Sequence, residues 1–180
     1  MTYWVRLENN VGNEVISYNP EGFYPESTVW RVMPEEFEGF VGLPTLQWEG
    51  VGEDSVQPVL ESAQEEMRLQ TRTLRWEAES SPITHFDKVF SCAREHRQLM
   101  LEYITTAELT ETLPPYKLLD GTWWTPASLE EIKSAYHAVI QKVATLFERE
   151  RITVTAINAA TTSSEALNAF LTEKPNFSLP

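Results

Sequence analysis

The feature that most constrains this chain is one long apolar stripe in its C-terminal third. The stripe recurs at helical spacing and consists of Leu129, Ile132, Tyr136, Val139, Val143, Leu146 or Phe147, Val154 and Ile157. It predicts a helix over 128–159, and the part from Leu129 to Ala159 would be about 46 Å long at roughly 1.5 Å per residue. Such a helix must pack along its length, on its own chain or on a partner. A break near 151–155 is an alternative, because β-branched residues crowd there.

Capping signals mark the starts of two C-terminal helices. Ser128 and Glu131 have the Ser-x-x-Glu spacing of a capping box, in which each side chain can satisfy a free backbone N–H group at the helix start. Thr162 and Glu165 repeat this spacing. The repeat predicts a short helix over 163–172.

A tight turn precedes the long helix. Asp120-Gly121 is a strong hairpin signal, because both residues tolerate the positive φ angles of a two-residue turn. It predicts a β-hairpin over 116–124, which ends in Trp123 and Trp124 and leads into the helix. The two indole rings are candidates for an interaction surface, and the alternative is that they clamp the start of the helix.

Two further segments precede the hairpin. Apolar residues at helical spacing predict a helix over 84–106. The connecting segment 58–82 starts like a helix, whereas the alternation over 69–77 favours a strand.

The first 57 residues are typical of a small β module. Strands are predicted over 2–7, 14–18 and 28–33, since β-prone residues alternate there and Asn, Pro and Gly supply the turns between them. From 35 to 54, glycines and prolines separate single aromatic residues, which favours an ordered loop or short β pieces. The sequence therefore predicts an α+β fold. A small N-terminal antiparallel β module (1–57) and a connecting segment (58–82) precede a mainly helical region with a long helix (83–180).

The charge of the chain excludes two classes of partner. The net charge is −13, and such a field repels nucleic acid and anionic membrane surfaces, so we expect neither as a partner. Residues 1–57 hold ten acidic and two basic residues, a net charge of −8. A basic partner surface could dock on this acidic part, although solubility alone also explains the charge. The polar N-terminus MTYWVRLENN predicts a soluble, intracellularly made protein.

No pattern of reactive residues indicates an enzyme. The cluster Glu35, Glu36 and Glu38 is typical of solvated surface charge, because acid/base pairs and cation sites need carboxylates that converge from different parts of a fold. The single cysteine, Cys92, lies among apolar residues and is expected to be a buried, inert thiol. We therefore expect no catalytic, cofactor-binding or metal-binding residues and no cofactor.

The C-terminal half resembles a family of unknown biochemical activity found at the C-termini of tailed-bacteriophage tail and tail-fibre-associated proteins. The similar features are the Tyr-Lys-x-x-Asp-Gly sequence from Tyr116, the aromatic pair Trp123-Trp124, a long Ala-rich helix and the stretch from Ile157 to Leu167. The Glu-Arg-Glu-Arg run in the helix departs from the family pattern. The resemblance covers about residues 85–171.

The N-terminus is similar to the openings of many phage tail proteins. The matching pieces are Glu14-Val15-Ile16, Asn19-Pro20-Glu21-Gly22-Phe23 and Val29-Trp30. They occur in the same order as in those openings.

The resemblance implies a structural virion component of the phage tail, near the tail fibre or baseplate, that serves host attachment. Its localisation would be the virion tail after synthesis in the host cytoplasm, and its partners would be other tail or tail-fibre proteins. The alternative is a tail-fibre assembly chaperone that binds the fibre and need not remain in the particle. No catalytic residues come with the resemblance.

Phage fibres are commonly homotrimeric, which makes a trimer the favoured oligomer and a hetero-complex the other option. In a parallel three-helix coiled coil, the interaction residues would be Leu129, Ile132, Tyr136, Val139 and Val143, with Trp123 and Trp124 beside them. The competing interpretation packs the same helix on the predicted helix of its own chain at 84–106.

Overall fold

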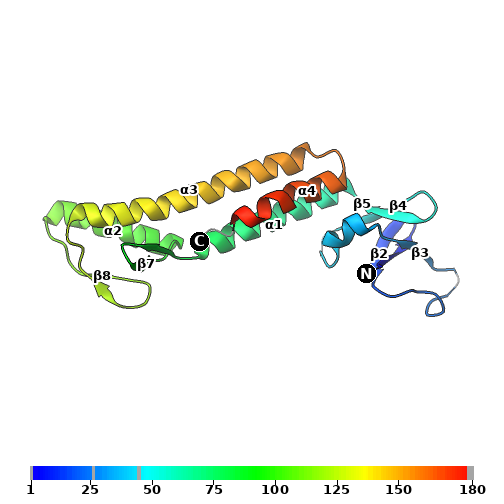
Figure 1. Cartoon of the computed structure of the whole chain (residues 1–180), viewed down its shortest axis with the longest axis horizontal. Helices are drawn as coiled ribbons and strands as arrows, with labels where there is room; N and C mark the ends of the chain where they lie inside the picture. Colours follow the sequence, from blue (N-terminus) through cyan, green and yellow to red (C-terminus); the bar gives the residue numbers. More distant parts are fainter. Residues whose placement is uncertain (1, 26, 44–45, 178–180) are drawn as a thin grey trace. The chain divides into compact units, whose positions relative to one another are not determined.

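The computed structural model describes residues 2–25, 27–43 and 46–177, and it confirms the α+β fold (Figure 1). The chain divides into two compact units. The first comprises Met1–Arg72 and Ile152–Pro175, and the second comprises Thr73–Arg151 and Asn176–Pro180. These limits differ from the predicted segments 1–57, 58–82 and 83–180, because two long helices contribute residues to both units.

The N-terminal β module is a small five-stranded barrel. Its strands are β1 (Trp4–Glu8), β2 (Val11–Ile16), β3 (Val29–Val32), β4 (Trp48–Val51) and β5 (Ser55–Pro58), closed in the order β1-β2-β4-β5-β3. The predicted antiparallel pairing of the first three strands is confirmed, with β1 between β2 and β3. Alternate side chains of β1 point inward, and Val5 and Leu7 are buried there.

The segment predicted as a loop or short β pieces closes this barrel. The 3-10 helix η1 (Glu35–Phe40) buries Phe37 and Phe40, and β4 and β5 follow it. Gly12 allows β2 and β4 to approach closely, since a Cβ atom added there would lie 2.4 Å from the Cβ atom of Trp48.

The helices are α1 (Leu60–Ser80), α2 (Arg94–Thr110), α3 (Leu129–Ala159) and α4 (Ser163–Glu173), and the short 3-10 helix η2 (Lys174–Phe177) follows α4. Two hairpins flank α2, namely β6 (Ile83–His85) with β7 (Lys88–Phe90), and β8 (Tyr116–Lys117) with β9 (Trp123–Trp124). The predicted long helix, short helix and hairpin over 116–124 are therefore confirmed.

The capping signals work as predicted at the start of α4. The Thr162 hydroxyl accepts a hydrogen bond from the Glu165 N–H group at 3.2 Å, and the Glu165 carboxylate reaches back to the N–H group of Thr161 at 2.7 Å. At α3, Ser128 Oγ accepts from the Glu131 N–H group at 3.3 Å. Both helix starts therefore satisfy backbone donors that would otherwise lack partners.

One prediction about α1 was wrong, and the alternative of a break in α3 is not observed. Residues 69–77 are helical within α1, because Met67 and Thr71 of this amphipathic helix are buried and that packing outweighs a short alternating pattern. The break near 151–155 does not occur. Thr153 and Ile157 are buried on one face of α3, so packing also offsets the weaker helix propensity of the β-branched residues.

The predicted helix over 84–106 was also wrong in its first part. Phe86 and Asp87 have φ angles of 50° and 54°, which a right-handed helix does not accommodate, and they form the turn of the β6–β7 hairpin. The hairpin places Phe90 in the core beside Trp124, with their rings 5.5 Å apart. The helix therefore begins at Arg94 and continues to Thr110.

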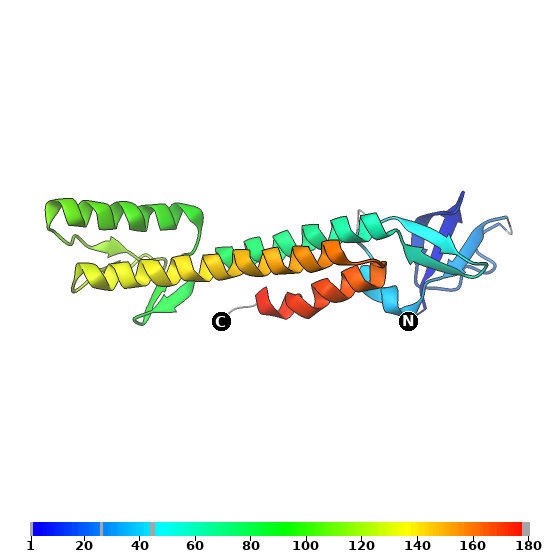
Figure 2. The same ribbon diagram turned by 90° about the horizontal axis from the view of Figure 1, so that it is seen from above.

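In the first unit, the N-terminal half of α1 lies beside the C-terminal end of α3 (Figure 2). Gln64 Nε2 donates hydrogen bonds to the carbonyl oxygens of Ile157 and Ala160, each at 3.1 Å. Arg68 donates to the Asn158 side chain at 2.7 Å. The Ile157 carbonyl oxygen also accepts from the Ala160 N–H group at 3.2 Å, so Gln64 adds a second donor at the end of α3.

In the second unit, α2 and the two hairpins cover the apolar stripe of α3. The buried cluster contains Phe90, Cys92, Met100, Ile104, Leu118, Trp124, Ile132, Ala135, Val139 and Val143. The prediction that Cys92 is buried is confirmed, and burial raises the pKa of its thiol.

A network of charged side chains joins three helices in the second unit. The carboxylate of Glu79 in α1 pairs with Arg75 one turn earlier and with Arg97 of α2 at 2.8 Å. Arg75 also pairs with Glu150 of α3 at 2.9 Å, and its guanidinium lies 4.5 Å from the ring centre of Phe147. The four charged side chains are only 13–18% exposed, so water screens their attraction weakly.

We expect Glu79→Gln to lower the free energy of unfolding by about 2 kcal/mol, between the limits for surface and buried ion pairs, since it leaves two arginines without their shared partner. Urea unfolding followed by circular dichroism measures this loss. Glu65→Gln is the matched control, because Glu65 pairs with Arg68 on the exposed side of the same helix. Equal midpoint shifts for the two variants would contradict a stabilising role for the network.

Candidate functional site

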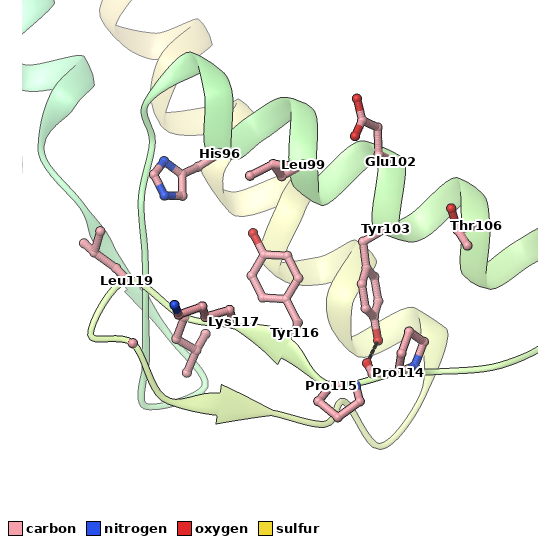
Figure 3. Close-up of a pocket in the computed structure, with 12 residues that line it drawn as sticks. His96, Leu99, Glu102, Tyr103, Thr106, Pro114, Pro115, Tyr116, Lys117 and Leu119 are labelled. Carbon is pink, nitrogen blue, oxygen red and sulfur yellow. Dashed lines mark hydrogen bonds between the residues drawn. The ribbon is translucent and has the colours of Figure 1, made fainter.

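A groove lies in the second unit, between α2 and the β8–β9 hairpin (Figure 3). Its volume is about 630 Å³. Its walls are mainly apolar and are formed by His96, Leu99, Glu102, Tyr103, Thr106, Pro114, Pro115, Tyr116, Lys117, Leu118, Leu119 and Gly121.

One face of α2 forms the first wall. His96, Leu99, Tyr103 and Thr106 follow one another at intervals of three and four residues, so they share a side of the helix. The adjacent side, with Met100 as one member, is buried against α3. Helix α2 therefore has a second apolar side, next to the one that builds the core.

The opposite wall is the segment that leads into the hairpin. Pro114 and Pro115 disfavour helix in this segment, and strand β8 begins at Tyr116. The rings of Tyr103 and Tyr116 meet edge to face with centres 5.4 Å apart. The Tyr103 hydroxyl donates to the Pro114 carbonyl oxygen at 2.5 Å, which ties the two walls together (Figure 3).

The turn at Asp120-Gly121 fixes the shape of the hairpin wall. Gly121 has a φ angle of 84°, which favours glycine, and its N–H group donates to the Leu118 carbonyl oxygen at 3.0 Å. The Asp120 carboxylate accepts from the Thr122 hydroxyl at 2.7 Å and from its N–H group at 2.9 Å. These hydrogen bonds from Thr122 lower the pKa of the Asp120 carboxyl group, so Asp120 is a turn residue rather than a proton donor.

The hairpin places Trp123 and Trp124, the two candidates for an interaction surface, on opposite faces. Trp124 is paired with Tyr116 and faces the core, where it is 9% exposed. Trp123 is paired with Lys117 on the other face and is 68% exposed. Trp124 therefore anchors the hairpin, while Trp123 stays available for contact.

The other predicted interaction residues are buried in the core of their own chain or pack against it. Ile132, Val139 and Val143 are buried in the cluster with α2, and Leu129 and Tyr136 pack against it. A coiled coil through this stripe would require α2 to leave it. The structure thus favours the interpretation that α3 packs within the chain, and the trimer stays a prediction.

Sequence reasoning missed the groove, and the exposed leucines are its clearest mark. Leu99 is 53% exposed and Leu119 is 46% exposed, on opposite walls. The ring atom His96 Nδ1 is buried and has no hydrogen-bond partner among the described residues. The one available sequence signal was the second apolar side of α2, at Leu99 and Tyr103.

The chemistry of the groove suits binding. Glu102 is the only carboxylate among the described residues that line it, and it lies on the same helix as His96. Within the described ranges, no three His, Cys, Asp or Glu side chains gather in a group that could hold a metal ion. Glu35, Glu36 and Glu38 lie in η1 of the other unit. In the part of the chain that the structure covers, no helix has the length and apolar character needed to span a membrane.

One comparison with known proteins identifies a family. A family model described as a domain of unknown function (DUF4376) matches residues 62–171. No curated protein and no solved structure matches the chain. The matched range includes α2, the hairpin and hence every residue of the groove.

We expect Tyr103 and Tyr116 to ionise above the ordinary tyrosine range near pH 10, because burial raises the pKa of both phenols. The neutral phenols therefore contribute to the stability of the folded state. This contribution is fully present below about pH 10, the unfolded-state pKa, and is lost as the pH rises through the folded-state pKa values. Absorbance titration of phenolate measures this. Tyr116→Phe should remove a late-ionising component, and removal of an ordinary component instead would contradict the assignment.

Proposed function

The chain belongs to the DUF4376 family, a domain of unknown function, and we propose that it is a non-catalytic structural component of a bacteriophage tail that helps to anchor or assemble the tail fibre. The groove between α2 and the β8–β9 hairpin is the observation that carries this proposal. It is open, mainly apolar and bordered by exposed leucines. The resemblance of about residues 85–171 to tail-associated proteins supports the choice of particle.

The groove would receive an extended apolar segment of another tail protein. Leu99 and Leu119 supply apolar contacts from opposite walls, and the rings of Tyr103 and Tyr116 lie between them. Lys117 and Glu102 at the same groove could pair with charges that flank the apolar residues of the partner. An extended segment fits because its side chains can reach both walls while its backbone stays in contact with water.

The second candidate function is a tail-fibre assembly chaperone. One observation favours it: the long stripe of α3 is already buried on α2, so the chain needs no partner helix to complete its core. A protein that is folded by itself and exposes one apolar groove can bind a fibre segment and later release it. The two candidates share the groove and differ in whether the chain remains in the particle.

Mass spectrometry of purified virions separates the two candidates. We expect peptides of this chain in mature particles, at a constant ratio to the other tail proteins. If the chain is missing from mature particles yet bound to fibre protein in infected cells, the structural role is refuted and the chaperone role is supported.

Substitutions in the groove test how the partner is bound. We expect Leu99→Asp and Leu119→Asp each to reduce co-purification with the fibre or tail protein at least tenfold, because a charge in the groove would have to lose water on binding. Leu109→Asp is the matched control, since Leu109 is 80% exposed on the same helix and lies outside the groove. Equal effects of all three substitutions would contradict docking in the groove.

A further inference from the structure

A second pocket lies on the barrel in the first unit, and its walls are aromatic. It has a volume of about 350 Å³ and lies between β1, β3 and the segment that connects β2 to β3. Trp4, Tyr24 and Trp30 supply its rings, and Glu21 supplies a carboxylate. It is large enough for one side chain of a partner.

Strand register explains why two tryptophans meet here. Val5 and Leu7 point into the barrel, so Trp4 and Arg6 point outward. Arg6 is directly opposite Trp30 in the antiparallel β1–β3 pair, which places Trp30 on the same outer face as Trp4. Both rings are therefore presented outside the core of the barrel.

The third ring is held against this face by its own hydrogen bonds. The ring centres of Tyr24 and Trp30 are 4.8 Å apart. The Tyr24 hydroxyl lies 3.1 Å from the Tyr18 hydroxyl and donates to Glu14 Oε1 at 3.4 Å. The hydrogen bond with Tyr18, burial and the negative charge of Glu14 raise the pKa of Tyr24 to about 12.

The charge around the pocket favours a cation. Residues 1–57 have a net charge of −8, and their only two basic residues are Arg6 and Arg31. Arg6 is paired with Glu14 at 3.2 Å. Arg31 lies on β3 next to Trp30 and is partly buried. Glu21, in contrast, is exposed at the pocket, with its N–H group donating to Asn19 Oδ1 at 3.0 Å.

We propose that this aromatic pocket binds an arginine side chain from a basic segment of a protein partner. The faces of Trp and Tyr rings attract cations, and Trp does so most strongly. A guanidinium group is flat, so it can stack on Trp4 or Trp30 while it donates hydrogen bonds to Glu21. The acidic surroundings attract a basic segment and repel an acidic one.

The site is independent of the groove and of the proposed tail function. All its residues precede the range that the family model matches, which begins at residue 62. A failure of groove docking would therefore leave this inference untouched.

The test measures binding of short, otherwise neutral peptides to the full chain, by calorimetry and tryptophan fluorescence. One peptide carries a single arginine, the second carries citrulline at that position, and the third carries lysine. Citrulline keeps the shape of arginine without its charge. We expect the arginine peptide to bind at least tenfold more tightly than the citrulline peptide and more tightly than the lysine peptide.

Two variants locate the binding. We expect Trp30→Leu to weaken arginine binding at least tenfold and Glu21→Gln to weaken it several-fold. Glu21 is exposed, so its substitution keeps the test valid if Trp30→Leu disturbs the barrel. Trp76→Leu is the control, since Trp76 is 64% exposed on α1 and lies outside this pocket.

Equal binding of the arginine and citrulline peptides would overturn the proposal. Unchanged binding by both the Trp30 and Glu21 variants would also overturn it. Tighter binding of lysine than of arginine would refute the choice of arginine.

Discussion

Burial of the apolar side of α3 is the interaction on which the rest of the structure depends. A helix of this length exposes a long apolar stripe, and burial of such area is the main favourable term in folding. The second unit covers Ile132, Val139 and Val143 with α2 and the hairpins. In the first unit, Ile157 is buried at the C-terminal end of the stripe, and its carbonyl oxygen accepts a hydrogen bond from Gln64 of α1.

The groove is a consequence of how that burial is achieved. Helix α2 uses the side with Met100 for the core, and the hairpin uses Trp124. Their other sides, with Leu99 and Tyr103 on α2 and Leu119 on the hairpin, border an open space. The contacts that stabilise the second unit thus also leave an open, mainly apolar groove on its surface.

Local signals in the sequence were sufficient for most elements. Caps such as Thr162 with Glu165, the Asp120-Gly121 turn and the stripe of α3 act through neighbours within one or two helical turns. Where the local pattern predicted the wrong element, contacts between residues distant in the sequence determined the structure. The hairpin at 83–90 replaced helix because Phe90 gains a place beside Trp124 in the core, with Phe86 and Asp87 in left-handed conformations.

The sequence by itself determined the α+β class, the long helix, the two capped starts and the acidic character of the N-terminal part. It could not determine which surface covers the stripe, because a helix shows the same apolar pattern whether its partner is α2 or another chain. Only the tertiary structure decided that Leu129 to Val143 serve the chain's own core. It alone brought Tyr103 to Tyr116 and Trp4 to Trp30, since both sites join residues whose proximity depends on strand register and helix packing.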